Sequence, residues 1–246
     1  MSDVFGTVFG QDTAVAQLRA AARAPVHAYL LTGPPGSGKR TAARAFAAAL
    51  LCPRGGCGAC GVCARALAEA HPDLIVVERE GASISIGQAR EIRRLALRTP
   101  NEGRRKVLVL TDFHLVQDAG PALLKVIEEP PPSTIFVILA AHVPPELITI
   151  ASRCVQIGFR AIDTHLLLQL LVADGIDPVV AEEVAKASGG RLDRARLLAS
   201  DPGFGTRREV WRTLPFRLDG TGAAVAGLAA ELVELLGDAA VAPLQA

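Results

Sequence analysis

The chain has 246 residues, of which 50% are hydrophobic and 21% charged, so it can bury a sizeable core and global disorder is excluded. This length suits one medium-sized domain followed by a smaller one. The formal net charge of +1 excludes a whole-molecule electrostatic field that would steer nucleic acid towards the protein.

The beginning of the chain carries acidic residues and has no long apolar segment, so we expect no export signal. No run of about 18 uncharged apolar residues occurs elsewhere in the sequence, which predicts that the chain does not span a membrane. Both observations favour a cytoplasmic location.

Helical and strand-like patterns alternate through the first 160 residues. Helices are predicted in 13–23, in an alanine-rich stretch from residue 39, in 85–100 and in 118–132, where three prolines end the pattern. Strands are predicted in 27–32, 71–80, 104–113 and 133–141. This alternation predicts an α/β fold whose parallel sheet is covered by helices on both faces.

The pattern changes after this α/β part, which we assign to residues 1–160. Residues 161–203 show only helical periodicity and predict a small helical domain. A short Gly/Pro-containing linker follows, and two more helical stretches reach the end of the chain within a third region, 204–246.

A glycine-rich segment between the first predicted strand and the alanine-rich helix matches the phosphate-binding loop G-x-x-x-x-G-K-[ST] except at its last position. That position should carry a hydroxyl that ligates magnesium, but it is Arg40, and the hydroxyl of Thr41 comes one residue later. The glycines permit a tight backbone path, and Lys39 can reach the outer phosphates. The candidate nucleotide site comprises Gly33, Pro34, Pro35, Gly36, Ser37, Gly38, Lys39, Arg40 and Thr41.

Asp112 completes this candidate site, because it ends the third predicted strand, where a Walker B aspartate holds magnesium. The next residue is Phe113, which cannot act as a base. General-base help is worth roughly 10²–10⁴-fold in rate, so the combined departures at positions 40 and 113 should leave little turnover. Two interpretations stay open: a loop that only closes the corner between strand and helix, and a site that binds ATP or ADP without hydrolysing it.

Four of the five cysteines fall within twelve residues, with the spacing C-x4-C-x2-C-x2-C; they are Cys52, Cys57, Cys60 and Cys63. In a cytosolic protein such clustering favours a metal over disulfides. Four thiolates complete a tetrahedral zinc shell without an open position, which predicts structural zinc. An iron–sulfur cluster uses similar ligands, but nothing else in the sequence indicates redox chemistry. Four free cysteines packed in a core would fit poorly in so glycine-rich a segment.

Arg153 follows the fourth predicted strand in the triplet Ser-Arg-Cys. An arginine in this place can project towards a nucleotide bound to a neighbouring subunit. These three residues by themselves favour the simpler interpretation, an ordinary surface arginine in a salt bridge.

Taken together, these segments resemble the bacterial clamp-loader AAA+ subunits of DNA polymerase III, in the same order and over nearly all of residues 1–200. The resemblance is carried by "FGQDTAVAQLRAAA", "HAYLLTGPPGSGK", the four cysteines, "HPDL", "GQAREIRRLAL", "ALLKVIEEPPPSTIFVILAA" and "SRC". Arg40, Phe113 and the alanines at 140 and 141, where polar sensor-1 residues are usual, make the chain similar to the delta-prime branch. The ATP-hydrolysing gamma/tau branch resembles it less.

The resemblance implies a five-membered ring that opens the sliding clamp and loads it on primed-template DNA, with gamma/tau and delta-like subunits as neighbours. It implies that Arg153 is a finger acting in trans and that the four cysteines hold zinc. Arg194, or Arg191 by a shift in alignment, would occupy the sensor-2 place. The family's third domain, a helical collar, would be only partly present in residues 204–246.

Two other functions are weighed against this one. The first is an ATP-hydrolysing gamma/tau-like subunit in which Thr41 or water replaces the missing hydroxyl, and Arg40 and Phe113 argue against it. The second is a stand-alone zinc-dependent nucleic-acid-binding module, which the closed cysteine shell and the near-zero net charge disfavour.

Overall fold

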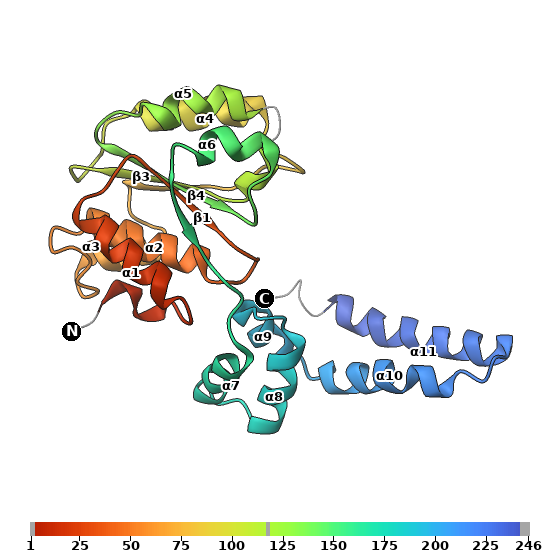
Figure 1. Cartoon of the computed structure of the whole chain (residues 1–246). Coiled ribbons are helices and arrows are strands. Elements are labelled where there is room, and N and C mark those ends of the chain that lie inside the picture. The colour runs from red at the N-terminus through yellow and green to blue at the C-terminus, as the bar shows by residue number, and fades with distance from the viewer. Residues whose placement is uncertain (1–2, 117–118, 242–246) are drawn as a thin grey trace. The chain divides into compact units, whose positions relative to one another are not determined.

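The computed structural model describes residues 3–116 and 119–241 (Figure 1). The chain divides into two compact units. The first runs to Leu167 and includes Gly189–Leu192, and the second contains Leu168–Ser188 and the chain from Asp193 onward. The finer predicted division of residues 161–246 into two domains stays a prediction.

A five-stranded parallel sheet forms the centre of the first unit, in the order β2-β3-β4-β1-β5. The strands are β1 (Ala28–Thr32), β2 (Leu74–Val77), β3 (Lys106–Leu110), β4 (Thr134–Ala140) and β5 (Val155–Gly158). This confirms the predicted α/β fold with a parallel sheet. The sequence did not predict β5, because only Ile157 of its four residues is buried and an edge strand lacks the apolar run of a central one.

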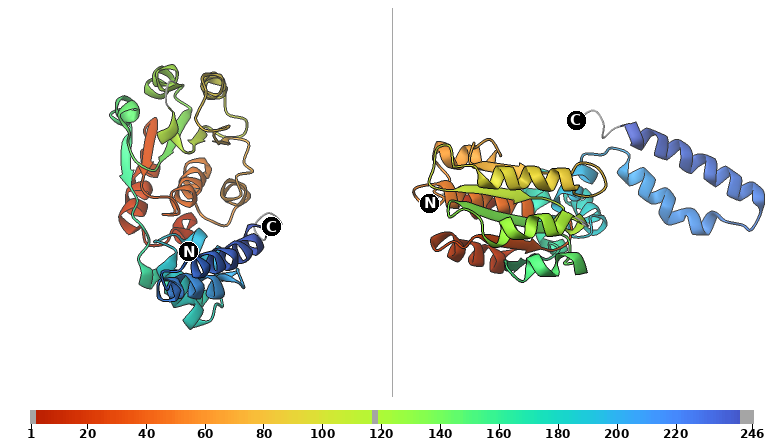
Figure 2. Two further views of the ribbon diagram at one scale, coloured as in Figure 1. Left: turned by 90° about the vertical axis from the view of Figure 1, so that its right-hand side faces the viewer. Right: turned by 90° about the horizontal axis from the view of Figure 1, so that it is seen from above.

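Helices cover both faces of the sheet, as Figures 1 and 2 show. One face carries α1 (Asp12–Arg23), α2 (Lys39–Leu51) and α3 (Gly61–Leu67), and the other carries α4 (Ile86–Leu97), α5 (Gly120–Glu128) and α6 (Ile148–Ala151). Short 3-10 helices η1 (Val4–Thr7), η2 (Phe113–Leu115) and η4 (Pro145–Leu147) also belong to this unit. The predicted helices from residues 13, 39, 85 and 118 correspond to α1, α2, α4 and α5.

The strands supply both halves of the core, because successive side chains of a strand point to opposite faces. In β4, Val137 packs in the cluster under α1, α2 and α3, whereas Phe136 and Ile138 pack in the cluster under α4 and α5. Every residue of β3 and β4 is buried, as expected for central parallel strands.

The buried side chain of Lys106 caps the C-terminal end of α4. Lys106 is 1% exposed, and its ammonium donates hydrogen bonds to the last carbonyls of α4, those of Leu95 (2.5 Å), Ala96 (3.1 Å) and Arg98. The carbonyl of Leu95 also accepts from the N–H of Arg98 (3.3 Å), and that of Ala96 also accepts from the hydroxyl of Thr134 (2.9 Å), so Lys106 adds to a shared set of caps at this helix end. Burial lowers the pKa of Lys106 below its ordinary value.

Lys106→Met is expected to lower the free energy of unfolding by about 1–3 kcal/mol, since it removes three hydrogen bonds to the carbonyls at this end of α4. Urea denaturation followed by circular dichroism measures this difference. Lys125→Met, at an exposed position of α5, is the matched control and should change stability by less than about 0.5 kcal/mol. Equal stabilities of the two variants would contradict the capping role.

The second unit is helical and contains most of α7 (Thr164–Ala173), α8 (Pro178–Ala187), α9 (Leu192–Ala199), α10 (Phe204–Arg217) and α11 (Gly222–Val241). Its small core includes Leu171, Ala181, Val184 and Ala195. Arg217 of α10 forms a two-pronged ion pair with Glu231 of α11. Among the described residues, no helix is long and apolar enough to cross a membrane.

Candidate nucleotide site and metal centre

The phosphate loop follows β1 directly and leads into α2. The N–H of Gly33 donates to the carbonyl of Ala140 at the end of β4 (3.2 Å). A Cβ atom on Gly33 would lie 2.3 Å from the carbonyl oxygen of Phe159, so only glycine fits there. Gly38 caps α2 in the left-handed region (φ 87°). The loop therefore presents the N-terminus of a thirteen-residue helix, whose free N–H groups favour anions.

Lys39, the first residue of α2, lies folded over this loop. Its ammonium donates to the carbonyls of Gly33 (2.6 Å) and Pro34 (2.7 Å) and approaches the hydroxyl of the buried Ser37 (3.3 Å). Burial lowers the pKa of Lys39, and the nearby carboxylate of Asp112 opposes that shift. All three hydrogen-bond acceptors are neutral, so a phosphate oxygen would be a stronger partner for this ammonium.

Arg40 is held by carboxylates. Its guanidinium forms a two-pronged hydrogen bond with Glu69 (2.8 and 2.7 Å) and a further bond with Glu78 (2.6 Å). The hydrogen bonds that Arg40 donates to Glu69 raise the pKa of Arg40 above its ordinary value. Thr41 is the next residue of α2, and successive residues of a helix point about 100° apart. The hydroxyl of Thr41 therefore does not point in the direction of a side chain at position 40.

Asp112 and Phe113 lie just beyond the C-terminal end of β3. Asp112 has a left-handed backbone (φ 49°), and its carboxylate lies 3.6 Å from Nε of Arg79, which follows β2. Phe113 is fully buried and belongs to the core under α4 and α5. The second Walker B position therefore contributes packing and has no group that could take up a proton.

Two histidines that the sequence did not place in the site lie beyond β3 and β4. The N–H of Ala141 donates to Nδ1 of His114 (3.3 Å), and the ring of His114 lies 5.3 Å from that of His142. Burial lowers the pKa of His114, which keeps its ring neutral and able to accept this hydrogen bond at pH 7. β4 ends at Ala140, where the resemblance predicts a sensor-1 position, and this residue has no polar side chain.

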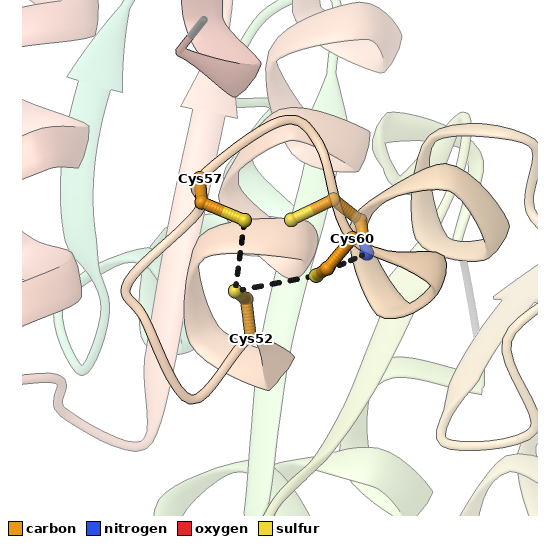
Figure 3. Close-up of side chains that lie close together, drawn as sticks. Cys52, Cys57 and Cys60 are labelled. Carbon is orange, nitrogen blue, oxygen red and sulfur yellow. Dashed lines mark hydrogen bonds between the residues drawn. The ribbon is translucent and has the colours of Figure 1, made fainter. Parts of the chain in front are cut away.

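The four clustered cysteines converge at one point. Their sulfur atoms all lie within 4.8 Å of one another, and Sγ of Cys52 is 3.9 Å from that of Cys57 and 3.7 Å from that of Cys60 (Figure 3). A tetrahedral zinc site with Zn–S bonds of about 2.3 Å has sulfur–sulfur edges of about 3.8 Å. The donor set and its spacing therefore fit one metal ion.

Backbone groups support these sulfurs. The N–H of Cys63 points at Sγ of Cys60 (3.5 Å), and the N–H of Arg54 points at Sγ of Cys52 (3.4 Å). The N–H of Cys63 lowers the pKa of Cys60 to about 6. A thiolate is the form that binds a metal, so this ligand is prepared for binding at neutral pH.

The cysteine cluster is part of the protein core. Cys52 and Cys63 are buried and pack in the same cluster as α1 and α2. A Cβ atom on Gly56 would lie 2.9 Å from Val4 and 3.1 Å from Ala49, so the cysteine loop lies tightly against η1 and α2. Loss of a metal bound by this cluster would therefore disturb α2.

Arg153 lies just after α6, at the surface of the first unit. Its Nε lies 3.0 Å from a carboxylate oxygen of Glu128 at the end of α5, and its guanidinium donates to the carbonyl of Thr149 (2.9 Å). Within the chain by itself, Arg153 forms the surface salt bridge that the sequence had suggested as the simpler alternative. A role towards a neighbouring subunit stays a prediction.

Comparisons with known proteins decide the family. The family described as DNA polymerase III, delta subunit, matches residues 10–163. The chain belongs to the clamp-loader AAA+ family. Subunit delta' of DNA polymerase III from Pseudomonas aeruginosa is 35% identical over an alignment of 223 positions, and the match covers 78% of this chain and 67% of that protein.

Other relatives come from both branches of the clamp-loader family. Subunit gamma/tau of Mycobacterium tuberculosis H37Rv is 35% identical over 200 residues, and subunit delta' of Bacillus subtilis is 29% identical over 188 residues. These matches cover 76% and 75% of this chain but only 35% and 57% of the relatives. Identity alone therefore does not distinguish the two branches.

Solved structures agree with this fold. A gamma subunit-related protein of DNA polymerase III from Thermotoga maritima superposes with a TM-score of 0.51 at 17% identity, covering 89% of this chain and 70% of that chain. A RuvB variant from the same organism gives 0.56 at 16% identity, covering 87% and 68%. At such low identity these similarities show the fold alone.

The structure assigns the two sensor-2 candidates of this clamp-loader chain to different units. Arg191 belongs to the first unit, with the phosphate loop, and Arg194 lies in α9 of the second. The sensor-2 assignment stays a prediction. Sequence patterns did not reveal the partners Glu69, Glu78 and Arg79, because they contact the site from positions 29 to 38 residues away and form no local motif.

Proposed function

We propose that this chain is a delta-prime-like subunit of the DNA polymerase III clamp loader. In this role it supplies Arg153 as a finger and gives structural support for ATP-driven loading of the sliding clamp on primed DNA. It hydrolyses little or no ATP itself. The observation that carries the proposal is a well-formed phosphate loop in which Arg40 pairs with carboxylates and the position after Asp112 is a buried phenylalanine.

The first support comes from the magnesium ligands. Catalysis by a phosphate-loop ATPase needs a hydroxyl directly after the lysine and a Walker B aspartate. Arg40 has no hydroxyl, and Asp112 faces the guanidinium of Arg79 at 3.6 Å. A magnesium ion would have to compete with that cation for a single remaining carboxylate.

The second support comes from the attacking water. In many ATPases a carboxylate beside the Walker B aspartate polarises the attacking water, and Phe113 has no group that can do so. Since Phe113 is fully buried, the position serves the core. Lys39 and the free N–H groups at the start of α2 remain, so ATP or ADP can bind weakly without being turned over.

The four cysteines are proposed to hold one zinc ion. With four thiolates and no open position, the ion would supply structural stability. The fit rests on the sulfur–sulfur distances of 3.7 and 3.9 Å and on the supporting backbone N–H groups. Metal binding would then stabilise the fold of the segment between α2 and α3.

The proposed partners are gamma/tau and delta-like subunits, the sliding clamp, and primed-template DNA bound by the assembled ring. Residues 161–203 are proposed to act as the lid and residues 204–246 as part of the collar. Exposed apolar side chains on the α10–α11 pair, such as Trp211 (52% exposed) and Phe216 (89%), are consistent with contacts to other subunits.

Steady-state ATP hydrolysis by the purified chain tests this proposal against the gamma/tau-like alternative. We expect a rate indistinguishable from that of Lys39→Ala, because two groups that normally support the chemistry are missing, and each such group is worth roughly 10²–10⁴-fold. Magnesium-dependent turnover that Lys39→Ala abolishes would instead identify an active ATPase subunit. Steeply salt-dependent DNA binding by the chain alone would support the stand-alone nucleic-acid module.

A further inference from the structure

We propose that Arg40 is a positioning residue that links the phosphate loop to the cysteine module, defined here as residues 52–70. Metal binding in the module and the conformation of the loop would then be coupled. This inference rests on the proposed metal site and goes beyond it, because it gives a role to the residue that departs from the phosphate-loop pattern.

The module contacts both ends of α2. It begins at Cys52, which caps the C-terminus of α2, and it returns to the N-terminus of that helix at Glu69, the partner of Arg40. A thirteen-residue helix is about 20 Å long, so the module runs the full length of α2 between these two contacts. The phosphate loop leads directly into the end that Glu69 holds.

The ion pairs at this end form a small network. Glu69 accepts two hydrogen bonds from Arg40 and lies 3.3 Å from Nε of Arg44, one turn further along α2. The side chain of Glu69 is only 21% exposed, whereas that of Glu78, the other partner of Arg40, is 60% exposed. A two-pronged pair to a half-buried carboxylate is stronger and more directional than a typical exposed pair.

The position of Glu69 depends on α3. Glu69 has a left-handed backbone (φ 56°), and its N–H donates to the carbonyl of Ala66 in the last turn of α3 (3.2 Å). With seven residues, α3 is too short to be stable by itself. Two of the four metal ligands hold its beginning: Cys60 is its N-cap and Cys63 lies in its first turn.

These contacts form one continuous path from the metal ligands through α3 and Glu69 to Arg40 and the phosphate loop. Coupling between two sites is reciprocal. Breaking the pair between Arg40 and Glu69 should therefore speed metal loss, and metal loss should loosen the phosphate loop.

The first measurement is the rate at which the zinc-loaded full chain releases zinc to a chromogenic chelator under reducing conditions. Arg40→Gln and Glu69→Gln should each release zinc about two- to fivefold faster than wild type, the range expected for a partly exposed ion pair. The double variant should release zinc no faster than Glu69→Gln alone, because that substitution already breaks the contact with Arg40. Glu78→Gln removes the partner of Arg40 that lies outside the module and should release zinc at the wild-type rate.

The second measurement is hydrogen exchange of the amides in residues 33–44. Zinc removal should speed their exchange in the wild type, and in Arg40→Gln they should exchange faster even with zinc bound. Wild-type protein that binds no metal would overturn the metal site itself. Stoichiometric zinc with unchanged release from Arg40→Gln, or equally fast release from Glu78→Gln, would overturn the coupling and leave the metal site standing.

Discussion

Removal of zinc is expected to lower the thermal midpoint of this chain by at least about 10 °C. Binding of a structural zinc to small modules is worth ~10–16 kcal/mol, and a loss of 1 kcal/mol shifts the midpoint of a chain of this size by roughly 2–4 °C. The effect should reach beyond the cysteine loop, because Cys52 and Cys63 pack in the same core cluster as α1 and α2. Elemental analysis before and after chelation measures the bound zinc, and calorimetry on the same samples measures the thermal midpoint.

The fifth cysteine provides a matched control for this experiment. Cys60→Ser should lose stoichiometric zinc and show the lowered midpoint, whereas Cys154→Ser should keep both zinc and most of the stability. Burial raises the pKa of Cys154 to about 12, so its thiol stays neutral, and it lies outside the cluster. If the purified protein contains iron and absorbs visible light, the cysteines hold an iron–sulfur cluster instead of zinc. Purified protein that contains no metal would overturn the metal site.

Arg153→Ala is expected to leave the chain folded but to lower the DNA-stimulated ATPase of the reconstituted clamp loader. An arginine finger is worth ~10³–10⁵ in rate at the site that it completes. The loader should therefore lose at least the share of turnover that comes from that neighbouring site. The isolated chain should lose less than about 1 kcal/mol of stability, because the ion pair with Glu128 is partly exposed.

Glu128→Gln separates the two interpretations of Arg153. It removes the ion pair at 3.0 Å within the chain and retains the arginine. If Arg153 acts as a finger, the loader containing Glu128→Gln keeps its ATPase and the loader containing Arg153→Ala does not. If the salt bridge is its whole role, both variants show the same small stability change and the same, undiminished, loader activity.

Local patterns were sufficient to predict most of the α/β unit. The apolar runs in 104–113 and 133–141 correspond to β3 and β4, and the capping Ser85 marks the start of α4. The short elements β5, α3 and α6 were not predicted, since four to seven residues are too few for a periodic signal. They form because neighbouring strands and helices already provide hydrogen bonds and an apolar surface.

The sequence by itself determined the phosphate loop, the buried position of the Walker B strand and the fourfold cysteine spacing, because each depends on residues close together in the chain. It also showed that position 40 lacks the usual hydroxyl. Only the tertiary structure decided what Arg40 does instead, namely pair with Glu69 and Glu78, and that Arg153 pairs with Glu128. These contacts join residues 25 to 38 positions apart, and folding of the sheet and its helices, rather than any local pattern, brings such charges within hydrogen-bonding distance.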